Sequence, residues 1–234
     1  MKKNSDLQSD FVNLTSHQLR TPLSGMKWLL ELLQKTDTGN LNRKQRDFIE
    51  KIYSSNERMI ALVNDLLEVS RIEGGKAKLY LQPTDLTVII RGLLKEKAKE
   101  VQKKNLQISF TTEHEPFPLA RTEPNKIKQA LSNLLSNAIA YTPPAGKISI
   151  DLKTSGAEIL CTIVDSGVGI PKQQQRQVFS KFFRGSNVLQ IEATGTGLGL
   201  YITKAFIEAS GGRIWFKSQE GKDTTFYFTL PIAK

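Results

Sequence analysis

The spacing of apolar residues changes at Gly74-Gly75, and this change divides the chain into two kinds of structure. Before these glycines, apolar side chains recur every three or four residues, first over residues 5–35 and again over residues 41–72. That period places them on one face of an α-helix. Beyond the glycines the apolar runs are short and alternate with polar residues, which is typical of half-buried strands. The chain therefore combines a helical first part with a mixed second part.

The two helical segments are joined by a short turn-like stretch, Thr36–Asn40. A short link makes consecutive helices antiparallel neighbours, so we expect an antiparallel helical hairpin. A single hairpin leaves half of its apolar stripe in water, and a second copy of the chain would bury that half. We therefore predict that residues 1–75 form a dimerisation domain, in which two hairpins make a four-helix bundle.

Residues 76–234 are predicted to form a second domain, which makes the whole chain α+β. The expected strands are 78–81, 106–112, 147–153, 158–165, 213–218 and 224–230. The expected helices are 86–104, 124–141 and 199–210. This mixture favours a two-layer α/β sandwich, in which helices cover one face of a sheet.

The net charge of +10 lies almost entirely in the second domain. Residues 1–75 hold 11 Lys and Arg against 10 Asp and Glu, which leaves 22 against 13 for residues 76–234. A basic domain attracts nucleic acid, an acidic protein or a phosphorylated ligand. Because the basic residues form no dense run with interleaved aromatics, we expect no nucleic acid partner and favour a nucleotide.

The sequence lacks the features of a zinc protein, a membrane-spanning protein and a secreted protein. Cys161 is the single cysteine and lies in a strand-like run, so we expect a buried, inert thiol, and no Cys/His cluster supports zinc. No run of about 18 apolar residues is present, and the N-terminus lacks the apolar stretch of a secretory signal. We expect a cytoplasmic core trimmed from a longer protein, with any membrane anchor in a missing upstream sensor region.

The first motif whose residues could take part in a reaction is Ser16-His17-Gln18-Leu19-Arg20-Thr21-Pro22-Leu23, inside the first long helix. The near neighbours of His17 are polar, and Thr21 lies on the same helix face, four residues further on. A single helical histidine is usually a solvated or hydrogen-bonded bystander, so the surrounding residues decide its role.

The second motif is Asn133-Leu-Leu-Ser-Asn137-Ala-Ile-Ala-Tyr141-Thr-Pro. Asn133 and Asn137 are four residues apart, so both amides project from one helix face. Carboxamide oxygens suit Mg²⁺, which takes few protein ligands and keeps phosphate oxygens and waters. In isolation, a polar helix surface is the commoner explanation of such a pair.

Two glycine-rich segments follow. Asp165-Ser-Gly167-Val-Gly169 comes directly after a strand, where the carboxylate can accept a hydrogen bond from an adenine amino group. Gly195-Thr196-Gly197-Leu198-Gly199 opens a helix, where backbone N–H groups suit phosphate oxygens. Between them, Phe179-Ser-Lys181-Phe-Phe-Arg184 places two cations beside aromatic residues. A tight turn explains each glycine cluster equally well, so only their combination is informative.

In this order the motifs resemble the core of sensor histidine kinases, over essentially residues 8–234. The octapeptide around His17 matches that family's Ser-His-Glu-Leu-Arg-Thr-Pro-Leu at seven of eight positions. A P-loop is excluded because no Gly-Lys-Ser/Thr is present, and a Rossmann site because no βαβ unit surrounds Gly195–Gly199.

The resemblance implies an ATP-dependent protein-histidine kinase that autophosphorylates on His17 and passes the phosphate to an aspartate of a response regulator receiver domain. It implies that Asn137 holds Mg²⁺. The other residues implied to bind ATP are Asn133, Tyr141, Asp165, Gly167, Gly169, Lys181, Arg184, Gly195, Thr196, Gly197, Leu198 and Gly199. A homodimer and an ATP-binding fold shared with gyrase and a heat-shock chaperone are also implied.

The sequence departs from the family at two important positions. Gln18 replaces the acidic residue that usually follows the phospho-accepting histidine, and it carries no charge. We therefore expect slow autophosphorylation. Ala140 stands where the family usually has a lysine, and Lys181 and Arg184 could supply the missing charge. In relatives, an acid or amide after the histidine, together with the later threonine, positions water for phosphatase activity, and Gln18 and Thr21 are suited to that role.

Two alternatives stay open. A degenerate kinase would bind nucleotide and dock a regulator, as a scaffold or mainly as a phosphatase, and Gln18 and Ala140 support it. An ATPase of the gyrase and chaperone kind would use a glutamate where this chain has Asn133, which argues against water activation.

Overall fold

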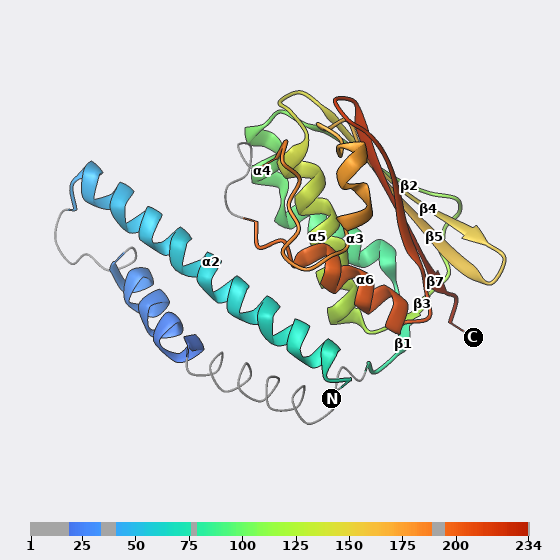
Figure 1. The fold of residues 1–234 in the computed structure, drawn as a ribbon, viewed down its shortest axis with the longest axis horizontal. Coiled ribbons are helices and arrows are strands. Elements are labelled where there is room, and N and C mark those ends of the chain that lie inside the picture. Colours follow the sequence, from blue (N-terminus) through green and yellow to red (C-terminus); the bar gives the residue numbers. More distant parts are fainter. Residues whose placement is uncertain (1–18, 34–40, 76–78, 189–194, 234) are drawn as a thin grey trace. The chain divides into compact units, whose positions relative to one another are not determined.

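The computed structural model describes residues 19–33, 41–75, 79–188 and 195–233. The chain divides into two compact units, Met1–Lys78 and Leu79–Lys234 (Figure 1). The described part of the first unit is helical, whereas the second unit combines helices with a sheet, as the change in apolar spacing predicts.

The first unit is a helical hairpin whose described helices span residues 19–33 and Arg43–Glu73 (α2). α2 begins at a capping box, which satisfies two backbone N–H groups. Asn42 accepts a hydrogen bond from the Gln45 N–H, while the Gln45 side chain accepts one from the Asn42 N–H. The predicted link Thr36–Asn40 lies outside the described residues.

Polar side chains show that the two helices are antiparallel. The Arg20 guanidinium donates a hydrogen bond to Oδ1 of Asn64 at 2.8 Å, and Lys27 forms an ion pair with Glu57 at 3.1 Å. The partners advance along one helix as they recede along the other, which confirms the predicted hairpin.

Many large apolar side chains of the hairpin remain exposed in the single chain. An exposed apolar stripe of this size marks an interaction surface. Its pairing into a four-helix bundle stays a prediction. The exposed residues are Leu19, Met26, Trp28, Leu29, Leu32, Leu33, Phe48, Ile52, Met59 and Leu62.

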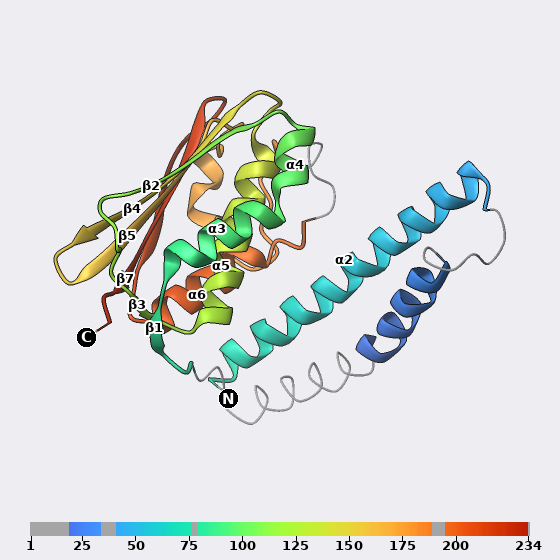
Figure 2. The same ribbon diagram turned by 180° about the vertical axis from the view of Figure 1, so that it is seen from behind.

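The second unit is built on a five-stranded sheet with the strand order β2-β4-β5-β7-β6. β2 and β4 are parallel, and the other neighbouring strands are antiparallel. Three helices cover one face of the sheet (Figures 1 and 2), which is the predicted two-layer sandwich. The strands are β2 (Gln107–Thr112), β4 (Lys147–Ser155), β5 (Glu158–Asp165), β6 (Ile214–Gln219) and β7 (Asp223–Pro231). The helices are α3 (Leu86–Glu96), α5 (Pro124–Tyr141) and α6 (Gly199–Ala209).

Alternation along the strands builds the core between the two layers. In β5, Ile159, Cys161 and Ile163 are buried, while the residues between them are half-buried. Side chains alternate between the faces of a strand, so these three share one side of the sheet and pack in the apolar core with residues of the helices. Burial raises the pKa of the Cys161 thiol far above its usual range, so this cysteine is inert, as predicted.

α5 lies against this core and presents its polar stripe outward. Its first residue is Pro124, at a position where the missing N–H is not needed. The buried residues of α5 are Ile127, Ala130, Leu131, Leu134, Leu135, Ala138 and Ile139. The half-buried stripe on the other side contains Asn133, Ser136, Asn137 and Ala140.

The strand predicted at 78–81 is misplaced. The observed strand, β1, is Gln82–Thr84, and it pairs antiparallel with β3 (Ala120–Thr122), which the apolar pattern did not predict. Of the predicted strand, Lys78 lies outside the described residues, and residues 79–81 have no partner strand in the described part of the chain. Tyr80 is exposed there, and its N–H donates to the Glu123 carboxylate instead of a strand.

The helix predicted over 86–104 is two helices, α3 and α4 (Ala98–Lys103), separated at Lys97. No glycine or proline marks this break. The Lys97 side chain donates a hydrogen bond to Oγ of Ser136 at 2.7 Å, which fixes the break beside α5. A 3₁₀ helix, η1 (Lys172–Gln177), was also not predicted.

None of the helices in the described part of the chain has the length and apolar composition needed to span a membrane.

Truncating Leu131 should destabilise the second unit strongly, because its side chain is fully buried between α5 and the sheet. We expect Leu131→Ala to lower the free energy of unfolding by about 2–5 kcal/mol, as measured by urea denaturation. Val88→Ala on α3, where the side chain is 65% exposed, should change it by less than about 0.5 kcal/mol. Similar losses in both variants would contradict the proposed position of the core.

Candidate functional site

The structure describes only part of the phospho-acceptor motif. His17 and Gln18 lie outside the described residues. Thr21 is exposed in the helix 19–33. One residue earlier, the hydrogen bond from Arg20 to Asn64 attaches this helix to α2.

The two asparagines of α5 have different surroundings. The amide of Asn133 donates hydrogen bonds to the Gly199 carbonyl at 3.1 Å and to Oγ1 of Thr203 at 3.4 Å, which ties α5 to the start of α6. A Cβ on Gly199 would lie 3.3 Å from Cγ of Asn133, so glycine allows this close approach. The Asn137 side chain makes no hydrogen bond to the described residues, so its oxygen is available to a ligand.

Asp165 is a buried carboxyl at the end of β5. It continues the alternation of that strand by one more step, which places it on the inner side of the sheet. The Gly167 N–H donates to Oδ1 of Asp165 at 3.0 Å. Burial raises the pKa of Asp165 to about 7, although the hydrogen bond from Gly167 opposes the shift. The negative charge of Asp223 also raises this pKa, by a smaller amount.

The turn after Asp165 packs against the end of α5. The Val168 N–H donates to the Tyr141 carbonyl at 3.3 Å. A Cβ on Gly167 would lie only 2.9 Å from the same oxygen, so the close approach requires glycine. Gly169 has a φ of +65°, which a side chain rarely adopts. The structure therefore brings Tyr141, Asp165, Gly167 and Gly169 together at one edge of the site.

The second glycine-rich segment packs against the Phe179–Arg184 stretch. Gly197 has a φ of +70°, and a Cβ there would lie 2.6 Å from the Phe182 carbonyl carbon. Gly195 approaches the Arg184 guanidinium, with 3.8 Å from its ideal Cβ position to Nε. The Leu198 N–H is bound by Oγ1 of Thr196 at 3.2 Å, directly before α6. Arg184 thus lies beside the segment predicted to bind phosphate.

Lys181 is exposed, and its ammonium lies 5.7 Å from the centre of the Tyr201 ring in α6. An open cleft of about 590 Å³ borders this region, lined by Gln174, Gln177, Ser180, Lys181, Phe182, Phe183, Arg184 and Ser186. It includes both predicted cations but neither asparagine nor Asp165. Of the residues predicted to bind nucleotide, the cleft therefore contains only the two cations.

Two residues that sequence reasoning missed hold the chain beyond Arg184 in place. Asn187 donates a hydrogen bond to the Gly169 carbonyl at 3.0 Å. Gln174 donates to Oγ of Ser186 and accepts from its N–H, at 2.8 and 3.0 Å. Neither residue belongs to a motif, so no signal in the sequence could have identified them.

Comparison with known families supports both halves of the chain. Residues 7–75 match the His Kinase A (phospho-acceptor) domain. Residues 122–234 match the histidine kinase-, DNA gyrase B- and HSP90-like ATPase domain. Together the two matches contain every motif described above.

Known proteins resemble the chain over nearly its whole length. Sensor histidine kinase WalK of Bacillus subtilis is 36% identical over 96% of the chain, which spans 37% of WalK. Circadian input-output histidine kinase CikA of Synechococcus elongatus is 32% identical over 96% of the chain, which spans 30% of CikA. The chain therefore corresponds to well under half the length of either relative.

A solved structure has the same fold. Full-length ShkA in complex with AMPPNP superimposes with a TM-score of 0.78 and 25% identity, covering 96% of this chain and 46% of ShkA. The agreement extends over both the helical hairpin and the sandwich. With its phospho-acceptor domain followed by an ATPase domain, the chain belongs to the sensor histidine kinase family.

Proposed function

We propose that the chain is an ATP-dependent protein-histidine kinase, in which His17 accepts the γ-phosphoryl group and passes it to an aspartate of a response regulator. One observation carries the proposal. A single unit brings together an asparagine helix, a buried aspartate turn and a glycine-rich helix start, in a chain that also has the His17 motif.

The two ends of the site suit the two ends of ATP. Asp165 is a buried hydrogen-bond acceptor, which fits the adenine amino group. The start of α6 offers backbone N–H groups and the positive end of the helix to phosphate oxygens. Arg184 and Lys181 lie near that end and add positive charge.

The carboxamide of Asn137 fits a magnesium ligand, because its oxygen is not used by the described residues, unlike the amide of Asn133. Among the described residues, no three His, Cys, Asp or Glu side chains cluster as a metal site. A bound Mg²⁺ would take most of its ligands from phosphate and water and would neutralise phosphate charge.

At His17, the lone pair of Nε2 forms a bond to the γ-phosphorus while the bond from that phosphorus to the bridging oxygen breaks. ADP leaves with the electron pair, and the imidazole gains positive charge. Gln18 can accept a hydrogen bond from Nδ1–H but cannot neutralise that charge, so transfer should be slow. The phosphoryl group then passes from Nε2 to a carboxylate of the receiver domain.

The exposed apolar stripe of the hairpin supports a homodimer, since a second copy would remove it from water. The exposed Thr21 and the uncharged Gln18 favour phosphatase activity toward the regulator as a second function. Orienting a water molecule requires hydrogen bonds rather than a base. Asn133 disfavours a plain ATPase, because its amide donates to Gly199 and Thr203 and it has no carboxylate to activate water.

Incubation of the chain with labelled ATP and Mg²⁺ should produce an acid-labile phosphohistidine, detected by mass spectrometry at His17. His17→Ala should abolish the label while leaving nucleotide affinity unchanged. Absence of label in the wild type, despite nucleotide binding, would favour the degenerate scaffold. Sustained phosphate release that survives His17→Ala would favour an ATPase.

Gln18→Glu should accelerate autophosphorylation, because a carboxylate would stabilise the charge that develops on the His17 imidazole. A general base typically contributes about 10²- to 10⁴-fold, so we expect single-turnover rates to rise by at least about tenfold. Gln18→Asn is the matched control, since it adds no charge. An unchanged or lower rate for Gln18→Glu would show that Gln18 does not limit the reaction.

ATP affinity should increase between pH 6 and pH 8 as Asp165 ionises, because the raised pKa of about 7 leaves much of the carboxyl protonated at pH 6. Asp165→Asn should bind ATP more weakly and lose this pH dependence, as measured by calorimetry.

The Asp165→Asn variant also tests how the ionisation of Asp165 affects the stability of the fold. The folded state holds the Asp165 proton more tightly than the unfolded state, so this group favours folding at low pH and loses that effect as pH rises from about 4 to about 7. As pH rises from 5 to 8, the free energy of unfolding of the wild type should fall by up to about 3 kcal/mol more than that of Asp165→Asn. Equal pH profiles for the two proteins would mean that the carboxyl titrates normally.

A further inference from the structure

We propose that Lys104 is a positioning residue for the adenine-binding edge of the site, because its ammonium holds the last turn of α5 against which the Asp165 turn packs. The inference rests on the proposed ATP-binding function. Lys104 lies outside every motif of the chain and directly follows α4.

The contacts of Lys104 account for all three N–H bonds of its ammonium. Nζ donates to the carbonyls of Ile139 at 2.8 Å, Ala140 at 2.6 Å and Thr142 at 3.2 Å. The main chain adds a further link, since the Ala145 N–H donates to the Lys104 carbonyl at 2.9 Å. The half-buried lysine is thus joined to the end of α5 and to the loop that follows it.

α5 needs such a partner for the carbonyls of Ile139 and Ala140, because its own cap, the Thr142 hydroxyl, donates to the Ala138 carbonyl instead. The last carbonyls of a helix lack intrahelical donors and carry the negative end of the helix dipole. α5 has no basic residue in its last turn, and its C-terminal cap is Thr142 rather than glycine. Lys104 supplies from a neighbouring element the positive charge that most helices carry near their own C-terminus.

The held turn is the part of α5 that touches the nucleotide site. Tyr141 lies between the residues whose carbonyls Lys104 binds, and its own carbonyl accepts the Val168 N–H. Gly167 approaches the same carbonyl, and its N–H binds the Asp165 carboxyl. A shift of the last turn of α5 would therefore move the Asp165 carboxyl, which is proposed to accept a hydrogen bond from the adenine amino group.

Lys104→Met tests this role, because methionine keeps the length of the side chain and removes its charge and donors. We expect the Kd for ATP to rise by about five- to tenfold, the effect of roughly one lost hydrogen bond at the adenine end. The Kd for GTP should change by less than about twofold, because guanine lacks the amino group that donates the hydrogen bond to Asp165. Lys104→Arg, which keeps the charge, should lie between the wild type and Lys104→Met.

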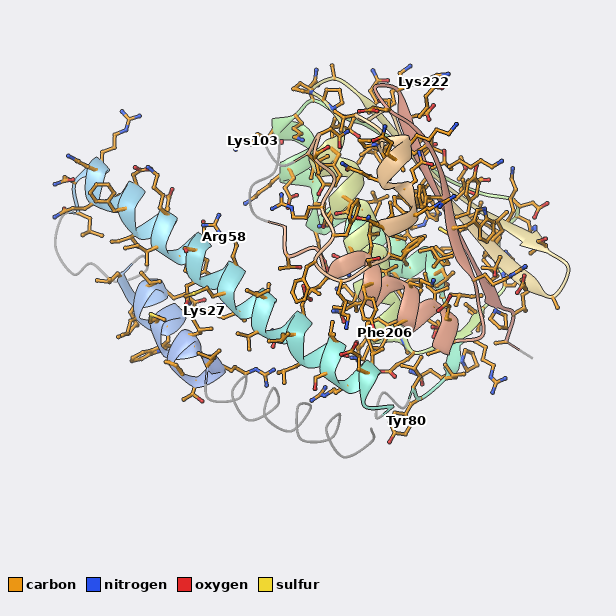
Figure 3. All side chains as sticks on the ribbon, in the orientation of Figure 1. Lys27, Arg58, Tyr80, Lys103, Phe206 and Lys222 are labelled. Atoms are coloured by element: carbon orange, nitrogen blue, oxygen red, sulfur yellow. The ribbon has the colours of Figure 1, made fainter. Side chains whose placement is uncertain are left out.

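Two controls separate positioning from general stability. Lys103→Met removes the charge of the exposed neighbour, labelled in Figure 3, and should leave both affinities unchanged. Asp85→Ala removes the N-terminal cap of α3, where Asp85 accepts from the N–H groups of Thr87 and Val88. It should lower Tm by about 2–4 °C without changing the ratio of ATP to GTP affinity.

Equal changes in the Kd values for ATP and GTP in Lys104→Met would overturn the proposal, as would an unchanged Kd for ATP. Hydrogen exchange gives a measurement that does not depend on nucleotide. The Val168 amide should exchange faster in Lys104→Met than in the wild type or Asp85→Ala, and equal rates would also overturn the proposal. If the wild type binds no ATP, the proposed function fails, while the exchange rates still decide whether Lys104 holds this edge.

Discussion

The burial of one face of the five-stranded sheet is the interaction on which the rest of the second unit depends. Alternation in β4, β5 and β7 directs every second side chain toward the helices, and a helix packed there must turn its own apolar face inward. For α5 this leaves Asn133 and Asn137 on the outer stripe. For β5, the same alternation carried one step beyond Ile163 buries the Asp165 carboxyl. The polar site therefore takes its geometry from apolar packing.

The elements that were predicted correctly are those with enough residues to show a period. α5 and β5 have the predicted bounds, because their apolar faces repeat over several turns or several pairs of residues. β1 and β3 have three residues each, which is too short for alternation to be distinguished from chance. The break between α3 and α4 at Lys97 has no glycine or proline to mark it in the sequence. Its partner is the Ser136 hydroxyl of α5, which only the structure places beside Lys97.

The residue types of the site were predictable, but their hydrogen-bond partners were not. Asn133 and Asn137 look equivalent in the sequence, yet only Asn133 is tied to α6, through a carbonyl 66 residues further along the chain. That distinction depends on how closely two helices approach each other. Lys104 is likewise hidden in a lysine-rich segment, where composition suggests a solvated surface. Its three carbonyl partners come from an element that the local sequence does not reveal.

The parallel pairing of β2 with β4 has a consequence for how the unit folds. The chain between these strands must travel back along the sheet, and it contains β3 and α5 on the way. Gln107 therefore meets Lys147 only after a long loop has closed, and such closure is entropically costly before any contact stabilises it. Because the crossover includes the asparagine helix, we expect the edge of the sheet and the nucleotide site to form in one late, cooperative step.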